Sequence, residues 1–136
     1  MKISLDEGAF LPVREHETDA GLDVRSIEDA VVYPHDTFTV HTGVHIELPK
    51  GTAGLLVSKS GMNVRNGITS TGLIDEGYSG EILVPLHNHS NTHYYIHKGD
   101  KVSQLVIIPV LYEQLEIVDD VASGDRGSAG FGSTGK

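Results

Sequence analysis

The chain has 136 residues, and 10 Lys and Arg against 19 Asp and Glu give it a net charge of −9 at pH 7. That length suits a single domain with its own core, and the acidic surplus argues against binding to nucleic acid through its phosphates. The absence of cysteine excludes disulfides, thiolate catalysis and cysteine-ligated zinc. The first residues contain no apolar run like a signal peptide or a membrane span, so we expect a cytoplasmic protein without a membrane partner.

Short apolar runs separated by turn residues make up most of the chain. Residues 37–48 alternate apolar with other side chains, which is the pattern of a strand with one buried face. Further runs follow at 55–57 and 82–86, and 102–110 holds four apolar residues in succession, as in a strand covered on both faces. Residues 60–66 have room for one or two helical turns, and no longer segment keeps a helical period. The pattern predicts an all-β fold of the sandwich, barrel or jelly-roll type.

Two polar positions in the first half of the chain are candidates for a site. Asp23 lies between apolar residues, where its carboxylate either satisfies backbone donors or faces a hydrated metal ion. Lys59, Ser60 and Gly61 come where a strand ends and a helical turn begins, so backbone amides, a hydroxyl and an ammonium group suit an anion there. A serine helix cap beside a solvated lysine is the alternative that fits the same residues.

Residues 69–81 predict a hairpin with polar groups at its bend. The bend carries Asp75 and Tyr78 among glycines, and residues on such loops often carry function. The alternative is that Asp75 only forms the turn and Tyr78 only caps an edge of the core. Gln104 is an amide within an apolar strand, and it must find hydrogen-bond partners if it is buried.

Eight histidines raise the question of a metal site. His41 and His45, and likewise His87 and His89, have the spacing of one strand face. No arrangement supplies three or four ligands in one compact motif, so we expect these histidines on solvated polar faces. No serine stands in the glycine pattern of a nucleophile elbow.

The last thirteen residues, 124–136, contain five glycines and little apolar surface. Composition alone favours a frayed end. Arg126 and Phe131, however, are a cation donor and a large aromatic side chain, which is typical of a segment that orders over a ligand. We therefore expect a domain at 1–123 followed by a C-terminal lid at 124–136.

Five segments, taken in order, resemble the motifs of the homotrimeric dUTP pyrophosphatase (dUTPase) family. They read AGLD at 20–23, KSG at 59–61, GLIDEGYSG at 72–80, GDKVSQ at 99–104 and RGSAGFGSTG at 126–135. The resemblance implies a jelly-roll-like β barrel of the dUTPase type, with at most a short helical segment. It also implies a homotrimer with shared active sites that cleaves dUTP to dUMP and pyrophosphate with Mg²⁺. Such a reaction keeps uracil out of DNA and supplies dUMP for the synthesis of dTMP.

The third of these segments would supply the catalytic carboxylate and bind the uracil. The resemblance implies that Asp75 orients and deprotonates the water that attacks the α-phosphorus. Tyr78 would pack under the deoxyribose and leave no room for a 2′-hydroxyl. Residues near the uracil, mainly through main-chain groups, would be Thr69, Gly72, Leu73 and Ile74.

The resemblance places the phosphates near the first, second and fourth segments. Ser60 and Gly61 would bind the phosphate bridge, and Gln104 would hold a phosphate or the site water. The family usually has Arg where this chain has Lys59, and Lys lacks the bidentate fork of Arg. Lys59 would therefore make a single phosphate contact or a salt bridge between subunits. Asp23 would belong to the hydrated shell of a Mg²⁺ ion that is bound mainly by the substrate phosphates, as suits so acidic a protein.

The C-terminal segment would close over a site on another subunit. In that arrangement Arg126 would contact the γ-phosphate and Phe131 would stack on uracil. Gly132, Ser133 and Thr134 would add phosphate contacts.

Two other functions fit parts of the same sequence. A dCTP deaminase shares the fold, but it needs a carboxylate after the third segment, and the strand at 82–86 offers none beyond nearby Glu81. A binding protein without catalysis would need neither Asp75 nor a complete C-terminal segment. Hydrolysis of dUTP is therefore the expected activity.

Overall fold

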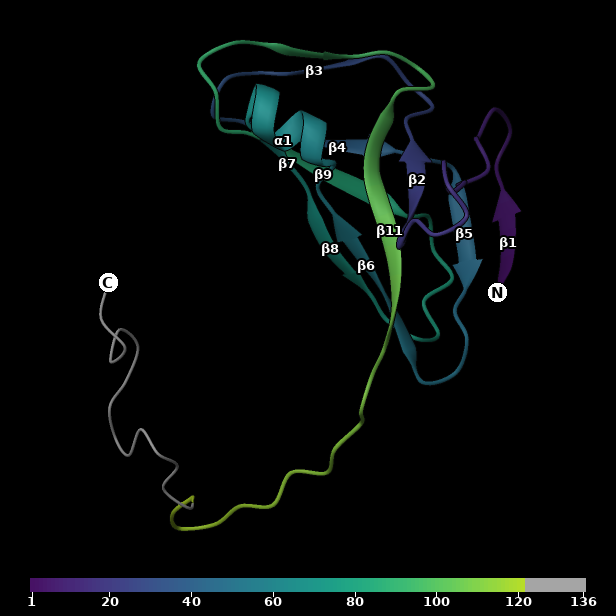
Figure 1. Ribbon diagram of the computed structural model, residues 1–136, viewed down its shortest axis with the longest axis vertical. Helices are drawn as coiled ribbons and strands as arrows, with labels where there is room; N and C mark the ends of the chain where they lie inside the picture. The colour runs from purple at the N-terminus through teal and green to yellow at the C-terminus, as the bar shows by residue number, and fades with distance from the viewer. Residues whose placement is uncertain (122–136) are drawn as a thin grey trace.

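The structure is a computed structural model that describes residues 1–121 of the chain. Within these residues β-strands dominate and one short helix is present, as expected for an all-β fold (Figure 1). The elements, in chain order, are β1 (Lys2–Leu5), β2 (Gly21–Arg25), β3 (Ala30–Val32), β4 (Thr37–His41), β5 (Val44–Glu47), β6 (Thr52–Val57), α1 (Ser60–Asn66), β7 (Ile68–Thr69), β8 (Thr71–Ile74), β9 (Leu83–Asn88), β10 (Tyr94–Ile96) and β11 (Lys101–Pro109). The helix falls on the residues expected for it. It ends at Gly67, whose backbone takes the left-handed conformation.

The strands form four antiparallel sheets around one core. The largest has the order β2-β11-β6-β8, the second has the order β4-β9-β7, and β1-β5 and β10-β3 are two-stranded. Figure 1 shows β11 running through the body with β2 on one side and β6 and β8 on the other. The described strands thus surround the core in a jelly-roll-like arrangement without joining into one closed ring. This is the all-β fold that the sequence predicted.

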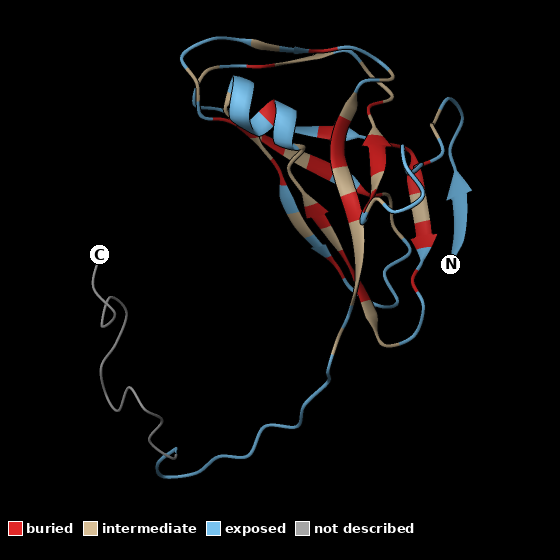
Figure 2. Cartoon of the chain, viewed as in Figure 1, coloured by how far each residue is buried: buried red, intermediate tan, exposed pale blue. Residues whose placement is uncertain are grey.

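All four sheets contribute to a single hydrophobic cluster, and this is why they pack together. Its fully buried members include Val24, Leu56 and Leu105 from the largest sheet and Val84 and Leu86 from the second. Figure 2 shows this burial along the strands, whereas β1 and the segment after β11 are exposed. Within residues 1–121 no helix is long and apolar enough to cross a membrane.

The alternating pattern at residues 37–48 belongs to two strands, not one. β4 and β5 lie in different sheets, and the turn between them contains Thr42 and Gly43. Gly43 has a φ of 63°, which favours glycine. Thr42 is buried, and its hydroxyl offsets the cost of burial by donating to the carbonyl of Ile82 at 2.6 Å. The alternation continues through the turn because Thr42 takes an inward position.

The connection from β8 to β9 corrects the hairpin expected for residues 69–81. β8 pairs with β6, whereas β9 pairs with β4 and β7 in another sheet. The hairpin prediction is therefore wrong, since residues 75–82 cross between two sheets. Ile74 and Ile82 are buried at the two ends of this crossing, and Gly77 takes a φ of 89° between them. Two apolar anchors thus hold a loop whose middle is exposed.

Candidate functional site

The largest sheet brings four distant sequence segments onto neighbouring strands. Asp23 on β2 pairs with Gln104 on β11, and Gln104 pairs in turn with Val57 at the end of β6. Lys59 and Ser60 follow directly after β6, and β8 lies on the far side of that strand. Because paired strands lie roughly 4.8 Å apart, the segments at 20–23, 59–61 and 99–104 meet in space. The residues predicted in the fifth segment, Arg126, Phe131, Gly132, Ser133 and Thr134, lie outside the part of the chain that the structure describes.

A chain of ion pairs is centred on Asp23, which is 3% exposed. One carboxylate oxygen of Asp23 contacts the ammonium group of Lys59, and the other lies 2.8 Å from that of Lys101. Lys101 also reaches Glu15 at 2.7 Å, and the Gln104 amide approaches Asp23 at 3.4 Å. Burial raises the pKa of Asp23, but the contacts with Lys101 and Lys59 outweigh it and hold that pKa below its ordinary value. Asp23 is therefore a charged group at neutral pH that directs the Lys59 side chain.

Ser60 and Gly61 open the helix α1 next to this cluster. Lys59 is the N-cap residue, with extended backbone and no side-chain cap. Ser60 is exposed, and a Cβ added to Gly61 would meet nothing within 4 Å. The buried Met62 side chain fixes the helix on the core. Of the predicted anion-binding residues, Ser60 and Gly61 therefore face open space, whereas Lys59 is turned toward Asp23.

A buried serine network, which the sequence reasoning missed, supports this end of the sheet. The hydroxyl groups of Ser70 and Ser103 lie 2.8 Å apart, and Ser103 also donates to the carbonyl of Val57. Ser58 accepts from the amide of Ser70 at 2.8 Å. Only the serine at 103, inside an otherwise apolar strand, gives a sequence signal of this network.

A pocket of about 360 Å³ lies between β8 and the start of β9. The residues that line it are Leu56, Gly72, Leu73, Ile74, Asp75, Tyr78, Glu81, Ile82 and Leu83. The pocket exists because β8 and β9 pair in different sheets and so diverge. Among the described strands β8 pairs only with β6, so one edge of its backbone faces this pocket without a strand partner.

Tyr78 lies over Gly80 at the mouth of the pocket. A Cβ on Gly80 would overlap the hydroxyl oxygen of Tyr78, so glycine is required for this position of the ring. The Tyr78 hydroxyl donates to the carbonyl of Glu81 at 2.9 Å, and the Tyr78 amide donates to the carbonyl of Asp75 at 3.1 Å. The loop thus presents the exposed Asp75 and one face of an aromatic ring to the same pocket.

Two further carboxylates near Asp75 are occupied by structural contacts. Glu76 accepts from the Gly51 amide at 2.7 Å and from the Tyr112 hydroxyl at 2.9 Å, and both contacts lower its pKa. Burial raises the pKa of Glu81, but its bonds to the Gly43 amide and to His41 outweigh this, so the pKa of Glu81 lies below its ordinary value. Asp75 is the carboxylate of this loop that stands exposed at the pocket.

Thr69 lies apart from the pocket. It belongs to β7, pairs with His87 on β9, and has its hydroxyl 2.7 Å from a ring nitrogen of His89. His41 and His45 hydrogen-bond to residues of the loop at 79–81. In residues 1–121 no group of three or more His, Asp or Glu side chains is placed to hold a metal ion.

The Asp23 cluster and the Asp75 pocket lie at different ends of the same strands. The pair Val57–Thr71 stands near the cluster, whereas the pair Gly54–Ile74 stands next to Asp75. Three residues along a strand span about 10 Å. Within one chain the predicted site therefore falls into two parts.

Three comparisons with known proteins agree with one another. Residues 8–135 match the family model for dUTPase. The deoxyuridine 5'-triphosphate nucleotidohydrolase of Clostridium acetobutylicum is 42% identical over 134 residues, which cover 96% of this chain and 92% of that protein. The protein of the same name from Picosynechococcus sp. is 38% identical over 136 residues, covering 98% and 96% of the two chains.

Solved structures show the same fold. The dUTPase of Staphylococcus bacteriophage 80alpha with dUpNHpp has a TM-score of 0.92 and 30% sequence identity, covering 99% of this chain and 98% of that chain. A dUTPase variant from phage phi11 of S. aureus, described with a structural Mg(II) ion, has a TM-score of 0.83 and 31% identity, covering 90% of this chain and 98% of that chain.

Proposed function

Because the chain belongs to the dUTPase family, we propose that it hydrolyses dUTP to dUMP and pyrophosphate. The observation that carries the proposal is an exposed carboxylate, Asp75, at a pocket walled by an unpaired strand edge and an aromatic ring. This activity would remove dUTP before its uracil enters DNA and would supply dUMP for dTMP synthesis.

The pocket suits a pyrimidine deoxynucleoside. Along Gly72, Leu73 and Ile74, alternate residues of β8 turn main-chain donors and acceptors to its outer edge, where they would pair with the edge of uracil. Tyr78 would lie against the deoxyribose, where its ring would exclude a 2′-hydroxyl. Thr69 lies in another sheet and does not line the described pocket. It would therefore contact the uracil only from outside this pocket.

Asp75 would act as the general base. It would accept a hydrogen bond from a water molecule, orient it toward the α-phosphorus and take its proton as the new oxygen–phosphorus bond forms. The bond from the α-phosphorus to the bridging oxygen would break on the opposite side, and pyrophosphate would leave.

The open surface at the start of α1 would take the phosphates. Ser60 and Gly61 would donate to the phosphate bridge, and Gln104 would bind a phosphate or the attacking water. Lys59 is engaged by Asp23 and would add at most one contact to a phosphate.

The described residues fit a Mg²⁺ ion that is held by substrate rather than by the protein. They supply no cluster of three ligands, and both Asp23 oxygens already face Lys59 and Lys101. Asp23 would therefore hold the ion only through water. When bound, the ion would neutralise charge on the phosphate oxygens.

A homotrimer would join the two parts of the site. The proposed assembly covers a domain at 1–123 and places the lid at 124–136 on a neighbouring subunit. Its lid residues would be Arg126 on the γ-phosphate, Phe131 on uracil, and Gly132, Ser133 and Thr134 on the phosphates.

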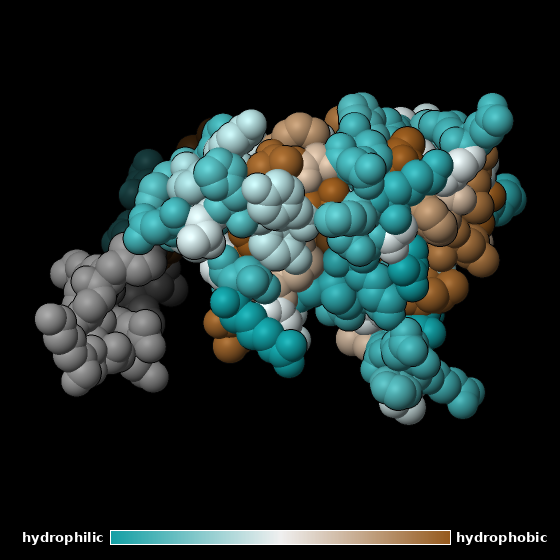
Figure 3. Space-filling model, turned by 90° about the horizontal axis from the view of Figure 1, so that it is seen from above, coloured by the Kyte–Doolittle hydropathy of each residue, from teal (hydrophilic) through white to brown (hydrophobic). Residues whose placement is uncertain are grey.

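Exposed apolar side chains, among them Ile3 and Leu5 of β1, support burial in an assembly. Figure 3 shows hydrophobic surface on the side of the molecule where β1 and β5 lie in Figure 1.

The geometry gives a dCTP deaminase little support. Both Glu81 oxygens accept hydrogen bonds, from the amides of Thr42 and Gly43 and from His41. A carboxylate with a lowered pKa and no free oxygen is poorly suited to transfer protons at a cytosine ring.

Product analysis tests the proposal. The protein is incubated with Mg²⁺ and either dUTP or dCTP, and the expected products are dUMP and pyrophosphate from dUTP. Asp75→Asn should retain nucleotide binding and lose about 100- to 10,000-fold in kcat, because an amide cannot accept the proton. Glu17→Gln, at an exposed position, is the matched control and should keep full activity. Ammonia from dCTP, or normal turnover by Asp75→Asn, would contradict the proposal.

A further inference from the structure

The turn between β4 and β5 holds the second half of the loop that carries Tyr78. The carboxylate of Glu81 accepts the amides of Thr42 and Gly43 at 3.0 and 2.8 Å. The amide of Ile82 donates to the carbonyl of Val44 at 2.8 Å. Because the Tyr78 hydroxyl is bonded to the Glu81 carbonyl, the place of the ring depends on this turn.

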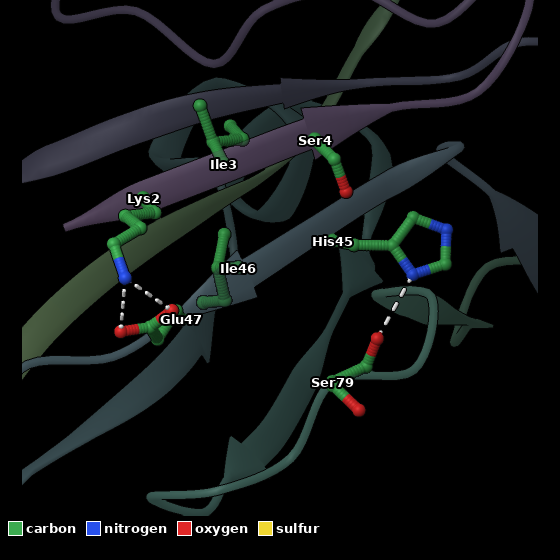
Figure 4. Close-up of a pocket in the computed structure, with 7 residues that line it drawn as sticks. All are labelled: Lys2, Ile3, Ser4, His45, Ile46, Glu47 and Ser79. Atoms are coloured by element: carbon green, nitrogen blue, oxygen red, sulfur yellow. Dashed lines mark hydrogen bonds and ion pairs between the residues drawn. The ribbon is translucent and has the colours of Figure 1, made fainter.

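His45 adds a side-chain contact to the same loop from the first residues of β5. One ring nitrogen, Nδ1, lies 3.0 Å from the carbonyl oxygen of Ser79, as Figure 4 shows with a dashed line. The other, Nε2, lies 3.3 Å from a carboxylate oxygen of Asp6. Asp6 is itself fixed, since its amide donates to the carbonyl of Gly43 at 2.9 Å. The imidazole thus bridges the residue after Tyr78 and the segment after β1.

Both partners of this ring are acceptors, and this determines its protonation. A neutral imidazole has one N–H, so it can donate to Ser79 or to Asp6 but not to both. Only the doubly protonated ring makes the two bonds together. The carbonyl of Ser79 and the carboxylate of Asp6 accordingly raise the pKa of His45 above its ordinary value, and Glu81 adds to the effect.

Other charges near the ring are already paired. Glu47 stands two residues along β5 and is bonded to Lys2 of β1 at 3.0 Å (Figure 4). His41 is bonded to Glu81 at 2.9 Å. These contacts leave Asp6 as the carboxylate in hydrogen-bond contact with the His45 ring.

We infer that His45 is a positioning residue for the pocket, whose doubly protonated ring ties Ser79 to Asp6 and so holds Tyr78 in place. Its effect on substrate rests on the proposed function, in which Tyr78 lies against the sugar. The tether itself does not depend on that function.

The sign of the pH dependence follows from the raised pKa of His45. The two bonds stabilise the loop fully at pH values below the ordinary pKa of histidine, and one of them is lost as pH rises through the folded-state pKa. Above that pH the Tyr78 loop should open more often. Discrimination between dUTP and UTP should fall, while kcat for dUTP, which depends on Asp75, should change less.

Hydrogen exchange of the full-length protein without nucleotide tests the tether. Protection of residues 78–82 is measured by mass spectrometry across the pH range of histidine titration, after correction for intrinsic exchange rates, and the His45 ring is titrated by NMR. The wild-type protection should fall about fivefold as His45 loses its proton. Asp6→Asn should move both transitions to lower pH, and His45→Gln should abolish the step that coincides with the His45 titration. A step that follows His41, which is bonded to Glu81 and has a raised pKa for that reason, should remain in this variant. His97→Gln, at an exposed position on another loop, should behave as the wild type.

The results separate this inference from the proposed function. Protection that does not follow the His45 titration, or a His45 pKa that Asp6→Asn leaves unchanged, would overturn the tether whether or not dUTP is hydrolysed. A confirmed tether in a protein that does not turn over dUTP would overturn only the proposed function. If His45→Gln fails to fold, the wild-type series and Asp6→Asn still decide the matter. In the active protein, a UTP/dUTP ratio of kcat/KM that stays constant through the transition would overturn the effect on Tyr78.

Discussion

Replacing Asp23 by asparagine removes the charge that joins two lysines beside β2, an edge strand of the largest sheet. Asparagine keeps the shape of the side chain but leaves Lys59 without its ion-pair partner. Lys101 retains Glu15 at 2.7 Å. The change therefore measures how much one buried carboxylate contributes to the free energy of unfolding.

The expected loss of stability is about 2 kcal/mol. Removing one partner of a fully buried ion pair costs about 3–5 kcal/mol, because the remaining charge stays desolvated. Here the carboxylate is buried, but the side chains of Lys59 and Lys101 are 23% and 26% exposed, so water screens part of the loss.

Urea unfolding at one fixed protein concentration measures this loss, since an assembly makes stability depend on concentration. Lys59→Met in the Asp23→Asn background should recover part of it, because no unpaired ammonium group then remains. The lowered pKa of Asp23 means that its contribution is present above the ordinary pKa of about 3.9 and is lost as pH falls through the folded-state value. The difference in the free energy of unfolding between wild type and variant should therefore be largest at neutral pH and vanish in acid. A loss below about 0.5 kcal/mol, or a difference independent of pH, would refute the assigned role.

Three substitutions test the pocket, and one deletion tests the C-terminal segment. Gly80→Ala should displace the Tyr78 ring through overlap with its hydroxyl and raise KM for dUTP about tenfold; an unchanged KM in steady-state assays would show that the ring does not contact substrate. Tyr78→Ala should raise the UTP/dUTP ratio of kcat/KM about tenfold, whereas Tyr78→Phe, which keeps the ring but loses its bond to Glu81, should raise it by a smaller factor; equal ratios in all three proteins would contradict the sugar contact. Deletion of residues 125–136 should lower kcat/KM about 100-fold or more and leave the unfolding midpoint unchanged; normal turnover by the truncated protein would exclude a lid.

Much of the candidate site could be proposed from the sequence because its residues occur in compact, ordered motifs. Asp75 and Tyr78 stand on a glycine-flanked bend, and the structure places both at one pocket. The helix at 60–66 could be predicted because a glycine, Gly67, follows a segment with room for one or two helical turns, and in the structure this glycine ends the helix in the left-handed conformation. Thr69 gave no such signal of its own, and its strand lies in a different sheet from the pocket wall.

Side-chain partners could not be predicted in the same way. Nothing in the sequence marks Glu76 and Glu81 as carboxylates held by backbone amides, or His45 as a contact of Ser79. The same holds for the pairing of Lys59 with Asp23, which lie 36 residues apart in the chain. Such contacts depend on which strands become neighbours, and so they are visible only in the folded chain.

The sequence by itself determined the all-β class, because alternation reports which side chains of a strand are buried. It did not determine which strands pair. Residues 69–81 have the pattern of a hairpin, yet β8 and β9 enter different sheets. The physical reason is that alternation specifies a buried face, while the choice of partner strand is made by packing of both faces around a shared core. Only the tertiary structure, in which Ile74 and Ile82 are buried at the two ends of the crossing loop, separates β8 from β9 and opens the pocket between them.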